Sequence, residues 1–191
     1  MNVGIVSTES AFSLGFSGVQ IRSTGVQWDL RKVIPYESYF KLKFKIPFSL
    51  NGDSYDRYLL RIEELQQSNQ IITQVINVIP KGIIKVENYK VVPPSREDTK
   101  CSMESLIHHF KLYSGGFIVP KGESYVGVES PKGEFGVYLL SDNTEIPYRC
   151  KIRAPGFMHL QGINYMSKGH LIADVVTIIG TLDIVFGEID R

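Results

Sequence analysis

The chain has 191 residues and a formal net charge of +1, and 43% of its residues are hydrophobic. This apolar content is enough for the core of one large domain, or for part of a bigger one. The near-neutral charge, without any polybasic run, argues against a nucleic-acid partner. Because no apolar run reaches about 18 residues, we expect no membrane-spanning helix, and no signal-peptide or Arg-rich transit segment is visible.

The first fifty residues contain two candidate strands. Val3–Val6 is apolar and begins so abruptly that we expect the N-terminal boundary not to be a natural domain edge. Glycines spaced through residues 4–25 favour a compact, tightly turning segment. Residues 39–46 alternate apolar and basic side chains, which is typical of a half-buried strand.

A long helix is the strongest pattern in the chain. Asp53 supplies an N-cap, and apolar residues then recur at three- and four-residue steps until Pro80. A helix of roughly 25 residues spans about 37 Å, and we interpret it as a core scaffold. Its apolar positions are Tyr55, Tyr58, Leu59, Ile62, Leu65, Ile72, Ile76 and Ile79.

A second helix is predicted after its N-cap, Ser102. His108 and His109 lie about 100° apart around it and cannot bind one metal together, so they fit structural or surface roles, with proton handling as the alternative. The side chains expected to face the core are Met103, Leu106, Ile107, Phe110 and Tyr113.

Residues 124–153 predict a meander of three antiparallel strands with turns at 131–133 and 142–143. The third strand, 148–153, alternates an apolar face with a basic face. A solvated face explains the basic residues, and a docking surface for an acidic partner or a cofactor-bearing subunit is the alternative. The cysteines, Cys101 and Cys150, form no C-x-x-C pair, so we predict free, buried thiols rather than metal ligands.

The last helix is predicted from an N-cap at Ser167 to Gly180 and is apolar around most of its circumference, so we expect it to be buried. His170, Asp174 and Thr177 share its one polar stripe. The predicted fold class is therefore α+β: a long scaffold helix and a buried C-terminal helix with a small antiparallel β meander.

The C-terminal tail, residues 183–191, interleaves large apolar side chains with charged ones. A polar, frayed end is the usual expectation, so we predict that this tail is packed and that its charges have partners. The sequence lacks the phosphate-loop, dinucleotide-binding, zinc-protease and serine-hydrolase motifs. The striped helix and the acidic tail are the remaining candidate site, with a non-catalytic buried polar network as the alternative.

Several long motifs resemble the 49-kDa subunit of respiratory complex I, the proton-pumping NADH:ubiquinone oxidoreductase. In chain order they are residues 28–32, 55–58, 102–111, 131–138, 148–152, 154–157 and 183–191. The resemblance runs over essentially the whole chain and corresponds to the C-terminal half of the family. It implies that residues 1–191 are the C-terminal part of one domain that a separate N-terminal-half polypeptide completes. An initiating Met1 favours a split gene over a cleaved product.

That family is similar to the large subunit of nickel–iron hydrogenases, which implies part of a hydrogenase large-subunit-like fold. Hydrogenases end in D-P-C-x-x-C-x-x-H, and the cysteines hold the metals. Asp183 keeps its place in this chain, whereas Val185 and Glu188 replace the cysteines and Arg191 replaces the histidine. Because a nickel–iron site needs thiolates, the resemblance implies no metal site and no cofactor held by this chain alone.

The resemblance implies that Asp183 and Val185 line a quinone cavity, that Phe186 adds an aromatic wall, and that Arg191 lies toward the terminal iron–sulfur cluster of a neighbouring subunit. Asp183 and the pair His170 and Asp174 are the candidates for proton handling. Leu182 departs from the glutamine usual in the family, so a polar contact from that side chain is not expected.

The implied function is one wall of the quinone-reduction pocket of an NADH:quinone oxidoreductase (translocase), not catalytic alone. Ubiquinone is the implied substrate, and a partner holds the 4Fe-4S cluster. The implied partners are the N-terminal half, the iron–sulfur subunit, a 30-kDa-type subunit and the membrane-arm quinone-channel subunit. The implied location is the matrix-side peripheral arm at the mitochondrial inner membrane, or the cytoplasmic face of a bacterial plasma membrane. The alternative is a non-catalytic structural or assembly module of the same arm.

Overall fold

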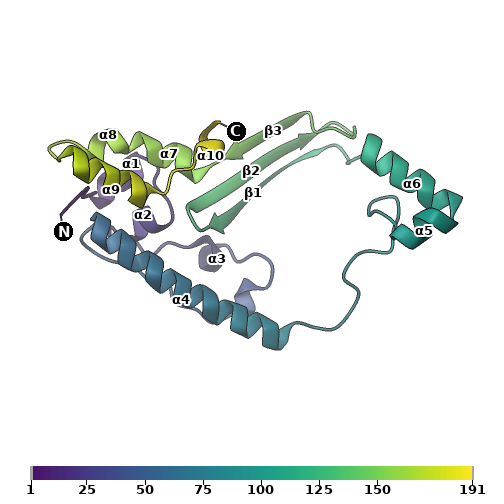
Figure 1. The fold of residues 1–191 in the computed structure, drawn as a ribbon, viewed down its shortest axis with the longest axis horizontal. Helices are drawn as coiled ribbons and strands as arrows, with labels where there is room; N and C mark the ends of the chain where they lie inside the picture. The colour runs from purple at the N-terminus through teal and green to yellow at the C-terminus, as the bar shows by residue number, and fades with distance from the viewer. Residues whose placement is uncertain (1, 191) are drawn as a thin grey trace. The chain divides into compact units, whose positions relative to one another are not determined.

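The computed structural model describes residues 2–190 and divides them into two compact units. Unit 1 contains residues 2–79, 126–136 and 152–190, and unit 2 contains residues 80–125 and 137–151. The three strands form one sheet in the order β1-β2-β3 and contribute residues to both units (Figure 1). The predicted α+β class and the small three-stranded meander are therefore confirmed.

The elements have the following bounds. The helices of unit 1 are α1 Thr8–Ser13, α2 Val19–Arg22, α3 Leu30–Val33, the 3-10 helix η1 Tyr39–Lys41, α4 Ser54–Val78, α7 Pro155–Gln161, α8 Ile163–Met166, α9 Ile172–Leu182 and α10 Phe186–Asp190. The helices of unit 2 are α5 Arg96–Cys101 and α6 Met103–Ser114. The strands are β1 Gly122–Ser130, β2 Gly133–Ser141 and β3 Arg149–Arg153.

The core lies in unit 1, where α9 packs against α4, α7 and α8 (Figure 1). Among the short helices, α1, α2 and α8 contribute Ala11, Ile21 and Met166 to the buried cluster that also contains Ile178 of α9. Ile184 of the tail is partly buried and packs against this core, so the predicted packing of the tail holds at that residue. The buried cluster is Val6, Ala11, Phe16, Ile21, Met166, Ile178 and Leu182.

One backbone approach brings the β1–β2 turn against the start of α2. A Cβ built on Gly18 would lie 2.6 Å from the Cα of Gly133, and both glycines have positive φ. A side chain at either position would separate the two segments. Glycine therefore fixes how close the hairpin comes to α2.

The long helix is confirmed as α4, with Asp53 as its N-cap and a stop two residues before Pro80. The Asp53 carboxylate accepts the Asp56 N–H, which satisfies one of the unpaired donors of the first turn. The expected apolar stripe is wrong as a core-facing surface. All eight of its side chains are exposed, and α4 instead buries Leu60 and the polar side chains Ser54, Asp56 and Arg57 of its first turn.

Neither predicted N-terminal strand forms. The Val6 N–H donates to the Gly52 carbonyl as an isolated loop contact. Residues 39–41 form η1, and the N–H groups of Lys43 and Lys45 donate to the side-chain amides of Gln74 and Gln67 on α4. Side-chain acceptors on a helix thus take the donors that a neighbouring strand would have used.

Unit 2 differs from the prediction in burial. The helix after Ser102 forms as α6, but its five expected core side chains are exposed. Cys101 and Cys150 are free, as predicted, but exposed rather than buried. Among the described residues, every buried hydrophobic side chain lies in unit 1. Unit 2 therefore has regular elements without a closed core of its own.

The last helix begins at Ile172 rather than at Ser167, and Gly180 lies inside it. Gly169, at φ +79°, takes the backbone out of helical geometry just before the helix starts. At the first turn the Asp174 carboxylate accepts the Leu171 N–H. The expected burial of this helix is wrong over most of its surface: Ile178 and Leu182 are buried, whereas Ile172, Val176 and Ile179 are exposed. Within residues 2–190, no helix has the length and apolar character needed to cross a membrane.

Candidate functional site

Asp183 lies at the point where α9 ends and the tail turns away. It has left-handed backbone angles, φ 54° and ψ 50°, which a non-glycine residue adopts only when its surroundings hold it there. Lys132, from the β1–β2 turn, contacts it twice: its Nζ lies 3.0 Å from the carboxylate Oδ1 and donates to the Asp183 carbonyl at 2.6 Å. Asp183 therefore has a charge partner, as expected for the tail, and this partner is a lysine 51 positions away in the sequence.

Asp183 lines a pocket within unit 1 of about 460 Å³. Walls from α2, α3, α4 and the β1–β2 hairpin surround it, so segments far apart in the sequence meet here. Three arginines and three carboxylates line the pocket together with the apolar groups of Tyr39, Leu65 and Pro131. The lining residues are Arg22, Arg31, Tyr39, Arg61, Glu64, Leu65, Ser68, Glu129, Ser130, Pro131 and Asp183.

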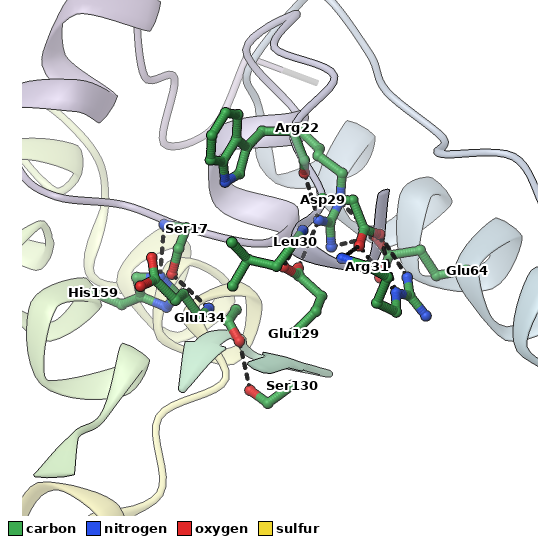
Figure 2. Close-up of polar contacts among 12 residues, drawn as sticks. Ser17, Arg22, Asp29, Leu30, Arg31, Glu64, Glu129, Ser130, Glu134 and His159 are labelled. Atoms are coloured by element: carbon green, nitrogen blue, oxygen red, sulfur yellow. Dashed lines mark hydrogen bonds and ion pairs between the residues drawn. The ribbon is translucent and has the colours of Figure 1, made fainter. Parts of the chain in front are cut away.

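Arg22 is the centre of a buried ion network (Figure 2). Its guanidinium lies 2.7 Å from the Glu64 carboxylate and 2.8 Å from the Glu129 carboxylate, and it also donates to the Trp28 carbonyl. The side chains of Arg22 and Glu129 are only 2% and 3% exposed. Burial by itself lowers the pKa of Arg22, but the two carboxylates outweigh burial and raise it.

The second pocket arginine, Arg31, pairs with Asp29 at 2.6 Å (Figure 2). Asp29 is also the N-cap of α3 and accepts the Arg31 N–H. The Glu129 carboxylate reaches the same helix by accepting the Leu30 N–H at 3.3 Å. The short α3 is therefore held by buried carboxylates at its first turn.

His170 and Asp174 lie at the other end of α9 from Asp183. The helix has 11 residues, which places its ends about 16 Å apart. His170 precedes the helix, its Nδ1 lies 3.8 Å from the Asp174 carboxylate, and its Nε2 accepts the Gly4 N–H at 3.3 Å. The structure thus brings the predicted pair together but separates it from Asp183.

The other predicted site residues belong to the tail. Val185 and Phe186 are 51% and 76% exposed and do not line the pocket that contains Asp183. Glu188 reaches the first turn of α7, where its Oε1 accepts the Gly156 N–H at 3.0 Å, a favourable place for a carboxylate. Arg191 lies outside the described residues.

The tail donors do not fit a nickel–iron centre. Asp183, Glu188 and Asp190 offer oxygen atoms, and the cysteines lie in unit 2. Within residues 2–190, no group of three or more His, Cys, Asp or Glu side chains is arranged to hold a metal ion. A nickel–iron site requires thiolates, which these tail residues do not supply.

The sequence prediction missed the arginine network and Lys132. Arg22 and Glu129 are 107 positions apart, so no local spacing relates them. One signal was available: Gln20 and Arg22 alternate with Val19 and Ile21 in a short apolar run. Polar side chains within such a run require buried partners.

Comparisons with known proteins give one consistent result. The profile of the family described as "Respiratory-chain NADH dehydrogenase, 49 Kd subunit" matches residues 1–191. The "NADH-ubiquinone oxidoreductase 49 kDa subunit" of Acanthamoeba castellanii is 64% identical over the whole chain, which covers 48% of that protein. A bacterial relative, an NADH-quinone oxidoreductase subunit of Ehrlichia ruminantium (strain Gardel), is 58% identical, with 49% of its length covered.

A third relative, from Nephroselmis olivacea, carries the name "NADH dehydrogenase [ubiquinone] iron-sulfur protein 2" and is 61% identical over 191 residues. The chain spans about half the length of the curated relatives that it matches. The match nevertheless covers every residue of this chain, and the motif-based resemblance is confirmed. The chain belongs to the family of the 49-kDa subunit of the respiratory-chain NADH dehydrogenase.

Proposed function

We propose that this chain forms one wall of the quinone-reduction pocket of an NADH:quinone oxidoreductase, next to the terminal 4Fe-4S cluster of a neighbouring subunit. The observation that carries the proposal is Asp183, a charge-paired acid in a left-handed turn at the edge of a pocket. Family membership supports the same assignment, because the names of the relatives include oxidoreductases that act on ubiquinone or quinone.

The chemistry of the tail suits a quinone ring. Val185 and Phe186 follow Asp183 closely in the chain and present exposed apolar surface beside a charged group. A quinone has an apolar ring with two polar oxygens, and small-molecule sites combine apolar walls with a few well-placed polar groups. In this proposal Val185 and Phe186 contact the ring, and Asp183 with Lys132 supplies the polar edge.

Quinone reduction takes up two electrons and two protons, so proton-handling groups are needed near the ring. Asp183 is the proposed group at the pocket, and its contact with Lys132 holds its carboxylate in place. His170 and Asp174 are the proposed relay at the far end of α9. Arg191, which follows the described residues, is proposed to lie toward the cluster and to favour its reduced form.

The remaining assignments extend this proposal. The chain is part of a hydrogenase large-subunit-like fold that an N-terminal-half polypeptide completes. It contacts the iron–sulfur subunit, a 30-kDa-type subunit and the membrane-arm quinone-channel subunit. The assembly lies on the matrix side of the mitochondrial inner membrane or at the cytoplasmic face of a bacterial membrane.

The second candidate is a structural or assembly module of the same peripheral arm. The observation that favours it is α6, where Met103, Phe110 and Tyr113 are exposed. Exposed apolar side chains gathered on one helix are typical of an interaction surface. Under this alternative the chain assembles the arm, and substitutions in its tail leave quinone chemistry unchanged.

Val185→Met separates the two candidates. The longer side chain narrows a wall that contacts the ring, so we expect the inhibitor concentration for half-inhibition of quinone reductase activity to change several-fold. The measurement is an inhibitor titration on membranes that carry the variant complex. Assembly should be preserved because Val185 is half exposed.

Val78→Met, at the exposed end of α4, is the matched control because it makes the same change far along the chain from the tail. An inhibitor titration with Val185→Met that overlays the Val78→Met control, at equal complex content, would refute the wall assignment. The assembly-module candidate predicts that overlay.

A further inference from the structure

The carbonyl end of α9 is held by side chains from outside the helix. A helix leaves its last four carbonyls without partners in the helix and carries a partial negative charge there. The Thr181 carbonyl, two residues before Asp183, accepts two hydrogen bonds: from Arg61 Nη2 at 2.6 Å and from Gln20 Nε2 at 2.7 Å. With Lys132 on the Asp183 carbonyl, the turn is fixed from three elements.

Gln20 and Arg61 are placed by the helices that carry them. Gln20 is 2% exposed and lies on α2, between the apolar side chains of the core. Arg61 lies on α4, lines the same pocket as Asp183, and also contacts the Arg57 carbonyl at 3.4 Å. Both side chains aim their donors at one oxygen, although they are 41 positions apart in the sequence.

This arrangement bears directly on Asp183. A left-handed backbone is less favourable for aspartate than a right-handed one, so the flanking contacts stabilise this turn. If the Thr181 carbonyl loses its donors, the end of α9 can unwind toward an ordinary right-handed turn. The Asp183 carboxylate and the tail after it would then change direction.

We propose that Arg61 and Gln20 are positioning residues that fix the C-terminal turn of α9 and thereby the orientation of Asp183 and the tail toward quinone. The proposal rests on the function proposed above and extends it to two residues outside the tail. Each acts through the Thr181 carbonyl.

The experiment compares Arg61→Gln and Arg61→Lys in the assembled complex. We expect Arg61→Gln to raise the apparent KM for a short-chain quinone about tenfold, the effect of losing one hydrogen bond from a charged donor. The rate of NADH oxidation with an artificial electron acceptor that bypasses quinone should stay unchanged. Arg61→Lys, which keeps a cationic donor, should recover most of the loss.

Two further variants make the test specific. Glu63→Gln is the matched control, because it removes a charge from an exposed position on the same helix. The Arg61→Gln, Asp183→Asn double variant should raise the quinone KM by less than the product of the two single effects, because Arg61 acts through Asp183. Gln20→Met, which removes only the second donor, should raise the KM in the same direction by a smaller factor.

Three outcomes overturn the proposal. A quinone KM unchanged in Arg61→Gln and Gln20→Met, while Asp183→Asn alters it, refutes positioning and leaves the pocket assignment standing. If the double variant raises the quinone KM by the product of the two single effects, Arg61 does not act through Asp183. An unchanged KM in Asp183→Asn itself removes the pocket assignment and the positioning role with it. If the Arg61→Gln complex fails to assemble, the quinone KM of the Gln20→Met complex tests the proposal instead.

Discussion

His159 is a histidine that the fold keeps uncharged. It is 1% exposed, packs edge-on against the Phe16 ring at 5.5 Å, and its Nε2 accepts the Ser17 N–H at 3.4 Å. Burial lowers its pKa to about 4, and the positive charge of Arg61 adds to the effect. An N–H donor aimed at Nε2 is compatible with the neutral imidazole.

The pH dependence of stability follows from this burial. The unfolded histidine has a pKa of about 6.5, so between pH 6.5 and 4 the unfolded chain binds the proton and the folded chain does not. The contribution of neutral His159 is fully present above pH 6.5 and is lost as the pH falls toward 4, by about 3 kcal/mol. We expect the difference in thermal midpoint between the native complex and His159→Gln to narrow across that window.

The measurement is thermal unfolding of both complexes at several pH values from 4 to 7. His159→Gln keeps a neutral acceptor for the Ser17 N–H but cannot titrate. Midpoints that run parallel across the window would show that His159 is already charged, or accessible to protons, in the folded protein.

At the scale of elements, buried charges join helices to the sheet. Arg22 at the end of α2 connects α4 through Glu64 and β1 through Glu129. An ion network of this kind adds less stability than its short distances imply, because desolvation opposes the attraction. Removing one member is costly, however, since it leaves the others buried without a counter-charge.

We therefore expect Arg22→Met to destabilise unit 1 by about 3–5 kcal/mol. The measurement is the thermal midpoint and yield of the assembled complex. Arg153→Met is the matched control: its pair with Glu134 is 30% and 27% exposed, so its loss should cost less than about 1 kcal/mol. Equal losses in the two variants would contradict the buried network.

A triple variant tests whether unpaired buried charge causes the stability loss expected for Arg22→Met. Arg22→Met combined with Glu64→Leu and Glu129→Leu removes all three charges and should recover much of the lost stability. Continued failure of the triple variant would indicate that packing of the arginine stem, rather than unpaired charge, explains the single substitution.

At the scale of the whole molecule, the two units differ in how they are stabilised. Unit 1 contains the buried cluster around α9, whereas no buried hydrophobic side chain lies among the described residues of unit 2. Local stability follows local burial. We therefore expect the α5 and α6 helices to be less stable than the helices of unit 1 unless another surface covers them.

Hydrogen–deuterium exchange tests this dependence. In the chain purified alone we expect the α6 amides to exchange much faster than those of α9. In the assembled complex both helices should be protected, because burial of Met103 and Phe110 by a neighbour would stabilise α6. Similar protection of α6 with and without the complex would contradict the expectation that unit 2 needs a partner surface.

Local sequence signals predicted local structure well. The N-cap at Asp53 and the stop before Pro80 bracket α4, and the turns in residues 124–153 gave the meander. These features depend on capping, proline geometry and turn residues, which act over a few positions. Burial was predicted poorly, because an apolar stripe indicates that a face will be covered but not whether this chain covers it.

The candidate site shows the same difference between local features, which were predicted, and long-range contacts, which were not. Asp183 was found from the tail motif, and the structure places it in a pocket. Its partner Lys132 and its supports Gln20 and Arg61 come from distant segments and carry no spacing signal. Strand 39–46 failed for a related reason, since alternation cannot tell a neighbouring strand from the side chains of α4.

The sequence by itself determined the family, the long helix and the hairpins, because these depend on contiguous motifs and short-range periodicity. Only the tertiary structure decided which charges meet around Asp183, which helix faces are covered and where α9 ends. The physical reason is range. Capping and turns act between neighbours in the chain, whereas ion pairs and burial depend on distances that exist only after the chain has folded.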